Sequence, residues 1–151
     1  MTATTIAYDL ETINVAAQAL LKAISEYGII TLSGDLGAGK TTLVSHLCQI
    51  MHVQDAVSSP TFSLVNEYLM QPDSTKSTMP LYHIDWYRLR DANEAMDAGM
   101  EDYLIQANNG EAWCIIEWPE KASELLTMPH IAATISVTGP YSREIVLTTR
   151  P

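Results

Sequence analysis

The sequence is poor in the features that mark secreted, metal-binding or membrane proteins. Among 151 residues there are only two cysteines. Neither Cys48 nor Cys114 stands at metal-ligand spacing, so we expect buried free thiols rather than a disulfide. No stretch approaches the roughly 20 apolar residues of a membrane span, and the first residues lack the positive charge and apolar core of a signal peptide. We therefore expect a cytoplasmic protein without membrane contact, with one domain over residues 1–151.

Basic residues are also scarce. Eight lysines and arginines stand against 18 aspartates and glutamates, which gives a formal net charge of −10. Unaided binding to DNA or RNA depends on Lys and Arg side chains that neutralise phosphates, so this balance argues against it. If RNA is involved, we expect another subunit to supply most of the basic surface.

What the chain does contain is a glycine-rich motif over residues 34–41, called the glycine loop below. Its letters, Gly-Asp-Leu-Gly-Ala-Gly-Lys-Thr, match every fixed position of the phosphate-binding pattern G-x-x-x-x-G-K-[ST]. An apolar run precedes it and a helix-like segment follows it, which is the order that the motif needs. Backbone N–H groups and a helix N-terminus then hold an anion. In such a loop Lys40 reaches the β- and γ-phosphates and the Thr41 hydroxyl ligates Mg²⁺.

Hydrophobic periodicity predicts an α/β domain around this loop. Helices are expected over residues 9–27, 40–51, 91–98 and 120–126. Strands are expected over residues 29–33, 63–69, 81–85, 113–118, 131–137 and 144–148. Asp9 is the expected cap of the first helix and Gly28 its stop, and residues 71–80 are expected to form a surface loop. The last two strands flank a Gly139-Pro140 turn, so we expect a C-terminal β-hairpin in a mixed, mostly parallel sheet flanked by helices.

Two of the predicted strands end in acidic residues that suit the metal-binding acid of a nucleotide hydrolase. The apolar run that ends in Glu117 matches the Walker B pattern, with its acid at the carboxyl edge of the sheet. Asp85 ends another strand and competes for the same role, as a Mg²⁺ ligand or as the group that orients the attacking water. His83 lies on the same strand face as Asp85, and a structural role for it stays as open as a functional one.

A third candidate segment is the turn-like Ser-Pro-Thr-Phe at residues 59–62. A hydroxyl on a loop after the nucleotide-binding helix is similar to the switch loops that close on Mg²⁺ and the γ-phosphate. Thr61 is therefore the candidate sensor.

Taken together and in this order, these segments resemble the TsaE (YjeE) family. The matching pieces are residues 34–42, 59–62, 83–89 and 117–119, and the resemblance covers roughly residues 8–148. The family consists of small bacterial P-loop ATPases that are needed for the threonylcarbamoyl modification of adenosine 37 in certain tRNAs. The resemblance implies a single-domain P-loop NTPase fold, ATP and Mg²⁺ as cofactors, and TsaB and TsaD as partners. It also implies that TsaD transfers the group to tRNA, so this chain meets tRNA only indirectly and its ATP cycle resets the TsaB–TsaD assembly.

The resemblance also implies roles for individual residues. Asp85 matches the family's active-site aspartate, Trp118 matches a functionally sensitive tryptophan beside the site, and Thr61 matches the switch-like loop. Thr41 and Glu117 are implied to serve Mg²⁺. The family's adenine and ribose contacts correspond to residues 10–12, from Leu10 to Thr12, and to Arg143. The implied phosphate contacts are Lys40 and the backbone of Gly37, Ala38 and Gly39. Further expected nucleotide-binding residues are Thr41, Thr42, Asp85 and Trp118.

Three other functions are alternatives to this interpretation. P-loop kinases commonly bring arginines over the phosphates in a lid, whereas the four arginines here form no lid-like cluster. A nucleotide-gated interaction module, in which binding rather than hydrolysis does the work, stays open. A GTPase is disfavoured because the sequence has no Asn-Lys-x-Asp motif.

Overall fold

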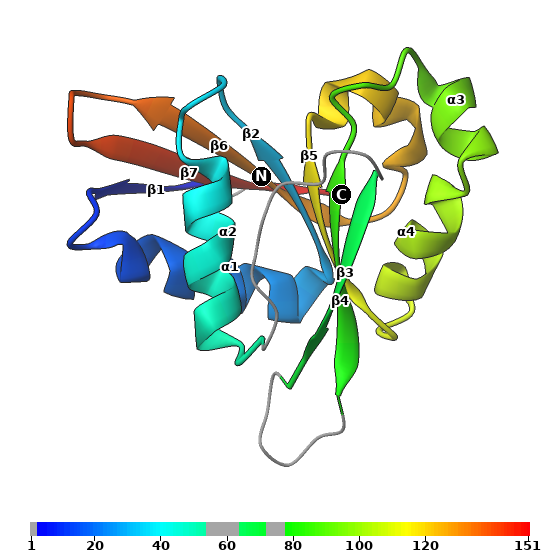
Figure 1. Ribbon diagram of the computed structural model, residues 1–151, viewed down its shortest axis with the longest axis horizontal. Helices are drawn as coiled ribbons and strands as arrows, with labels where there is room; N and C mark the ends of the chain where they lie inside the picture. Colours follow the sequence, from blue (N-terminus) through cyan, green and yellow to red (C-terminus); the bar gives the residue numbers. More distant parts are fainter. Residues whose placement is uncertain (1–2, 54–63, 72–77) are drawn as a thin grey trace.

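Strands and helices alternate along much of the chain, which places helices on both faces of one sheet (Figure 1). The computed structural model describes residues 3–53, 64–71 and 78–151. Its strands are β1 (Ala3–Tyr8), β2 (Ile29–Ser33), β3 (Val65–Met70), β4 (Met79–Asp85), β5 (Trp113–Glu117), β6 (His130–Val137) and β7 (Arg143–Arg150). Its helices are α1 (Ile13–Tyr27), α2 (Lys40–Ile50), α3 (Ala92–Asp97), α4 (Met100–Asn108) and the 3₁₀ helix η1 (Pro119–Leu125).

The sheet is mixed, with its parallel pairs in the middle. The strand order is β1-β7-β6-β2-β5-β4-β3. β2 pairs parallel with both β6 and β5, and β5 pairs parallel with β4. The outer pairs β1–β7, β6–β7 and β3–β4 are antiparallel. The expected α/β architecture, mixed sheet and C-terminal β6–β7 hairpin are therefore confirmed, and the carboxyl ends of β2, β4 and β5 meet at one edge.

Each face of the sheet carries its own apolar cluster. Side chains alternate between the faces along a strand. Ile30 and Leu32 of β2 thus join the cluster that contains the buried residues of α1 and α2. Ile29 of the same strand joins the cluster that contains Leu104 of α4. Figure 1 shows α1 and α2 grouped on one side of the sheet and α3 and α4 on the other. Burial on both faces explains why β2 and β5 read as continuous apolar runs.

The start of the chain differs from the sequence prediction. The first helix begins at Ile13 rather than at residue 9, and β1 precedes it. Asp9 does not cap the helix; its carboxylate accepts the N–H groups of Glu11 and Thr12 at 2.9 and 3.0 Å in the turn between β1 and α1. Gly28 does end the helix, as expected, with a left-handed φ of 77°.

Other elements are confirmed with shifted limits. Asp91 caps α3 by accepting the Glu94 N–H at 3.0 Å, but a further helix, α4, follows Gly99 and was not predicted. The predicted helix at 120–126 is the 3₁₀ helix η1. β4 begins at Met79, so the last two residues of the expected surface loop belong to a strand. Residues 72–77 of that loop lie outside the described ranges.

Both cysteines are buried and free, as expected. Burial raises the pKa of each thiol to about 12, which keeps it protonated at neutral pH. Over the parts of the chain that the structure describes, no helix has the length and apolar character needed to cross a membrane.

Candidate functional site

The glycine loop connects the end of β2 to the start of α2. Gly37 and Gly39 have left-handed φ values of 81° and 100°. No atom of the described residues lies within 4 Å of the place where a Cβ would stand at either glycine, so among these residues the space beside the backbone is open. The Ala38 N–H donates to the Asp35 carbonyl at 3.0 Å and closes a turn within the loop. A backbone that curls in this way ahead of a helix N-terminus is suited to an anion.

Lys40 is the first residue of α2 and is only 7% exposed. Its Nζ donates to the Gly34 carbonyl at 2.7 Å, so the lysine closes the loop upon itself. The same nitrogen lies 4.1 Å from the centroid of the Trp118 ring, within the range of a cation–π contact. The ammonium is thus held at the mouth of the loop by a carbonyl and an aromatic face.

The two predicted acids lie side by side at the sheet edge next to this lysine. Asp85 and Glu117 are register partners at the carboxyl ends of the parallel strands β4 and β5. Glu117 is 3% exposed, and its Oε2 lies 2.6 Å from Nε2 of His83, which is fully buried. His83, Asp85 and Glu117 face the α2 side of the sheet, because they alternate with residues of the α4-side cluster.

The two acids have different surroundings. Asp85 is half-buried, and its Oδ1 accepts the Tyr87 N–H at 2.9 Å. Burial raises the pKa of the Asp85 carboxyl above its ordinary value; the charge of Glu117 adds to the rise, while the Tyr87 hydrogen bond opposes it. Asp85 is therefore the more accessible acid, and Glu117 is the one held by a side-chain partner.

Trp118 follows Glu117 in an uncommon backbone conformation. Its φ is 58°, left-handed for a residue with a Cβ, and it stands just before η1. Its ring packs against Tyr87 with centroids 5.0 Å apart, and Lys121 lies 5.9 Å over the Tyr87 ring. The strained turn therefore presents the indole to Lys40, and links the glycine loop to η1.

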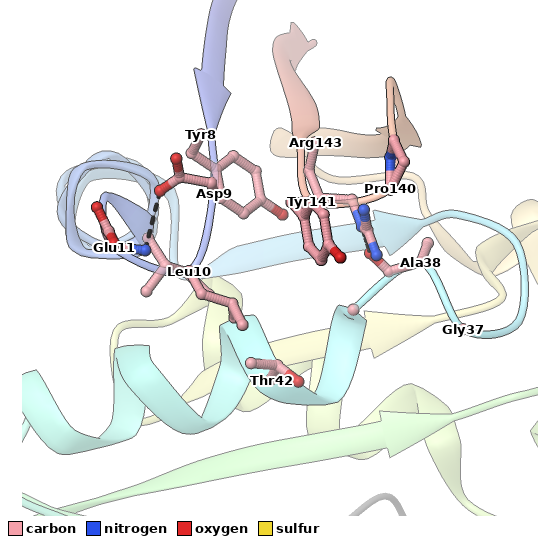
Figure 2. A pocket seen from close by; sticks show the side chains of 12 residues that line it. Tyr8, Asp9, Leu10, Glu11, Gly37, Ala38, Thr42, Pro140, Tyr141 and Arg143 are labelled. Carbon is pink, nitrogen blue, oxygen red and sulfur yellow. Dashed lines mark hydrogen bonds between the residues drawn. The ribbon is translucent and has the colours of Figure 1, made fainter.

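A pocket of about 500 Å³ opens on the other side of the glycine loop (Figure 2). It is bounded by the β1–α1 turn, the loop and the start of α2, and the β6–β7 turn. Figure 2 shows Leu10 on one side of this space and Tyr141 and Arg143 on the other. The lining residues are Tyr8, Asp9, Leu10, Glu11, Ile13, Gly37, Ala38, Gly39, Thr42, Pro140, Tyr141 and Arg143.

Arg143 ties the hairpin to the glycine loop. Its Nε donates to the Ala38 carbonyl at 3.0 Å, and its Nη1 donates to the Ser142 carbonyl at 2.9 Å and the Gly139 carbonyl at 3.3 Å. Residues 38 and 143 are thus joined across the length of the sequence, and the loop is braced from the side of the pocket.

The structure brings together most, but not all, of the residues singled out in the sequence. Leu10 and Arg143 line the pocket with Gly37, Ala38, Gly39 and Thr42, whereas Thr12 is not among the lining residues. The Thr12 hydroxyl instead donates to the Asp9 carboxylate at 3.1 Å and accepts the Asp9 N–H at 2.9 Å, so it shapes the turn.

The acids form a separate group on the Lys40 side. Asp85, Glu117 and Trp118 do not line the pocket. Thr61 lies outside the described residues. Within the described residues, no cluster of three or more His, Cys, Asp or Glu side chains is arranged to hold a metal ion.

The pocket residues that the sequence did not single out as site residues include two tyrosines. Tyr8 ends β1, a strand that was not predicted, and burial raises the pKa of its phenol. Tyr141 is 86% exposed and follows the Gly139-Pro140 turn, so no hydrophobic pattern marks it. An exposed aromatic side chain beside a predicted turn was the available signal.

Comparisons with known proteins identify the family of this chain. The family model described as "Threonylcarbamoyl adenosine biosynthesis protein TsaE" matches residues 7–145. The tRNA threonylcarbamoyladenosine biosynthesis protein TsaE of Bacillus subtilis is 35% identical over 120 residues, which is 80% of this chain and 68% of that protein. The protein of the same name from Haemophilus influenzae is 40% identical over 120 residues, 79% of this chain and 70% of that one.

A solved structure supports the fold. The crystal structure of Bacillus subtilis YdiB superposes with a TM-score of 0.64 over 99% of this chain and 87% of that one, at 24% identity. That identity shows the fold alone. The family match spans the glycine loop, both acids and the hairpin arginine, and the chain accordingly belongs to the TsaE family.

Proposed function

We propose that this chain binds ATP with Mg²⁺ and hydrolyses it in support of tRNA threonylcarbamoylation. The observation that carries the proposal is the glycine loop, with open left-handed glycines, a helix N-terminus and Lys40 at its mouth, beside a pocket of about 500 Å³. That volume falls within the usual range for small-molecule sites. Membership of the TsaE family supplies the biological process.

The residues present fit the phosphate end of a nucleotide. The phosphates would lie on the backbone of Gly37, Ala38 and Gly39, with Thr42 nearby. Lys40 would exchange its bond to the Gly34 carbonyl for a phosphate oxygen, which offers the ammonium a full negative charge. The adenosine would then occupy the pocket between Leu10 and Arg143, with Thr12 holding the β1–α1 turn from behind.

The acids fit a metal site that is completed by the nucleotide. Thr41, the second residue of α2, and Glu117 would serve Mg²⁺, and Asp85 would bind the ion or orient the attacking water. Mg²⁺ commonly takes one or two carboxylates together with substrate phosphates, so a full protein cage is not required. The bound ion would neutralise charge on the phosphates during transfer to water. Thr61 would close the site as the γ-phosphate sensor.

The chain would act on partners and leave the transfer to tRNA to them. With a net charge of −10, it has little basic surface for tRNA. We propose that the domain over residues 1–151 works in the cytoplasm on the TsaB–TsaD assembly. Hydrolysis would reset that assembly between turnovers, and tRNA would be met only through the partners.

Reconstituted tRNA modification with TsaB, TsaD and threonylcarbamoyl-adenylate tests the proposal. Wild-type protein with ATP should allow many turnovers, whereas its omission or Lys40→Ala should leave about one. Modification that continues through many turnovers with Lys40→Ala would refute the role of the glycine loop.

A gated interaction module without useful hydrolysis is the second candidate, favoured by the Lys40–Trp118 contact that links the loop to η1. Glu117→Gln at saturating ATP separates the two, because it should keep the metal-free part of ATP binding and slow hydrolysis. Multiple turnovers with Glu117→Gln would favour the module; a single turnover favours the ATPase.

A further inference from the structure

The buried contact between His83 and Glu117 stands out on the α2 face of the sheet. Nε2 of His83 lies 2.6 Å from Oε2 of Glu117, and the two residues are 0% and 3% exposed. The contact runs diagonally between neighbouring parallel strands, since His83 is opposite Ile115 and Glu117 is opposite Asp85. The sequence alone left the role of this histidine open.

The hydrogen-bond partners around the imidazole indicate which ring nitrogen of His83 carries a proton. Nδ1 of His83 is buried, and no described residue offers it a hydrogen bond. A ring whose proton is on Nδ1 would place a buried N–H where no described residue offers an acceptor, which is costly. A proton on Nε2 instead makes the 2.6 Å contact with Oε2 of Glu117 a hydrogen bond. His83 is therefore the donor, and the Glu117 carboxylate is the acceptor.

A contribution to stability does not explain why these two buried positions carry a polar pair. Leu81 lies two residues earlier on the same strand, faces the same cluster and is fully buried. An apolar side chain is thus compatible with this face. Replacing a buried polar pair by apolar residues of similar volume is often neutral or stabilising. The pair is better explained by what it does to the carboxylate of Glu117.

We propose that His83 is a positioning residue for the metal-binding acid. Its Nε2–H fixes Oε2 of Glu117 and so holds the other oxygen available to Mg²⁺. This inference rests on the proposed function, in which Glu117 serves the metal. Carboxylates that bind metals are usually held by such hydrogen bonds, and loss of the partner typically costs 10- to 100-fold in metal affinity or activity.

The test compares His83→Leu, His83→Gln and Glu117→Gln by calorimetric titration of ATP with Mg²⁺ and with EDTA. His83→Leu should reduce the gain in affinity that Mg²⁺ provides by about 10-fold or more, and leave metal-free affinity unchanged. His83→Gln, whose Nε2 can replace the lost donor, should recover part of that gain. In a Glu117→Gln background, His83→Leu should add no further loss.

His130→Leu is the matched control. His130 is also buried, but its ring bonds to the Met128 carbonyl at 2.9 Å at the start of β6, away from the acids. It should therefore lower thermal stability without changing the effect of Mg²⁺. If His83→Leu behaves in the same way, its role is structural and the inference is wrong.

A second readout needs no nucleotide and no substitution of His83. Nitrogen-15 NMR of the free protein should show the His83 ring protonated at Nε2, with a proton resonance that moves in Glu117→Gln. Protonation at Nδ1 would overturn the inference even if His83→Leu fails to fold. A different outcome would refute the metal role in the proposed function instead. In that outcome His83 is protonated at Nε2 as described, but Mg²⁺ does not change the ATP affinity of the wild-type protein.

Discussion

Lys40, Asp85 and Glu117 keep ionisable side chains in places that the fold largely covers. Lys40 and Glu117 are 7% and 3% exposed, and burial raises the pKa of Asp85. Such placements cost free energy unless each charge is paired. Lys40 has a carbonyl and an indole, Glu117 has His83, and Asp85 has the Tyr87 N–H. These local arrangements are what we expect where function, rather than stability, selects the residue.

Asp85→Asn should make the protein more stable at neutral pH. The folded state raises the pKa of Asp85 above 3.8, so it binds this proton more tightly than the unfolded chain does. Stability therefore falls as pH rises through the raised pKa, and the substitution removes that loss. The amide oxygen can still accept the Tyr87 N–H.

Thermal unfolding as a function of pH checks this prediction. The gain from Asp85→Asn should be present at neutral pH and vanish below about pH 3.8, where the aspartate is protonated in both states. Asp97→Asn, on the exposed end of α3, is the control. A wild-type protein that is more stable than Asp85→Asn at neutral pH would contradict the argument.

Trp118 should report nucleotide binding. Its ring lies 4.1 Å from Nζ of Lys40, and phosphates that draw this nitrogen away would change the surroundings of the indole. Intrinsic fluorescence should therefore change when ATP is added to the wild-type protein, and Trp118→Phe should lose the response. An equal response in Trp118→Phe would assign the signal to Trp86 or Trp113.

At the scale of elements, prediction from the sequence worked where local signals and packing agree. β2, β5 and α2 were found because doubly buried strands give apolar runs and the glycine loop marks the helix start. β1 was missed because most of its residues are exposed and only pairing with β7 defines it. α4 was missed because a glycine commonly marks the end of a helix, whereas the left-handed φ of Gly99, 80°, joins α3 to α4.

Some parts of the candidate site could likewise be predicted from the sequence, and others could not. The loop and both acids follow from motifs that stand at strand ends. The pocket does not, because the two turns that enclose it come from opposite ends of the chain and meet only through the sheet. The hydrogen bond between Arg143 and the Ala38 carbonyl, across 105 residues, has no local signal.

The end of α1 provides a test of packing between elements. Gly28 has a φ of 77°, and a Cβ there would lie 2.7 Å from the Ala107 carbonyl oxygen at the end of α4. Gly110 has a similar φ of 78°, but no atom of the described residues lies within 4 Å of a Cβ built there. Gly110→Ala should cost about 1–2 kcal/mol from the left-handed backbone alone.

Gly28→Ala should cost clearly more, because the backbone of α4 has to move as well. Chemical denaturation of both variants measures the difference in the free energy of unfolding. Equal costs for the two substitutions would show that α1 and α4 do not meet as closely as described.

At the scale of the whole molecule, the candidate site lies at one edge of the sheet. The glycine loop, Asp85 and Glu117 lie at the carboxyl ends of parallel strands, the edge where open α/β sheets bind ligands. Trp118 stands just before η1 and so connects this edge to that helix. The β6–β7 hairpin is hydrogen-bonded to the glycine loop and connects the edge to the pocket. A net charge of −10 leaves little basic surface for tRNA, which is consistent with the proposal that partners supply the contact with tRNA.

Partner binding should depend on the nucleotide. We expect the TsaB–TsaD assembly to bind this chain about fivefold more tightly with ATP than without nucleotide, a coupling of about 1 kcal/mol. Thr61→Ala should shrink that difference, because the proposed γ-phosphate sensor is lost. Interferometry in the apo, ADP and ATP states measures it. Equal affinities in all three states would exclude a nucleotide-gated switch.

The central claim is that the glycine loop holds the phosphates of ATP, and calorimetric titration of Lys40→Ala tests it most directly. Lys22→Ala, an exposed site on α1, serves as the control. The account predicts that Lys40→Ala lowers ATP affinity by about 100-fold, since it removes the ammonium that meets the phosphates, while the circular dichroism spectrum stays that of the wild type. Unchanged ATP affinity in a folded Lys40→Ala protein would contradict it.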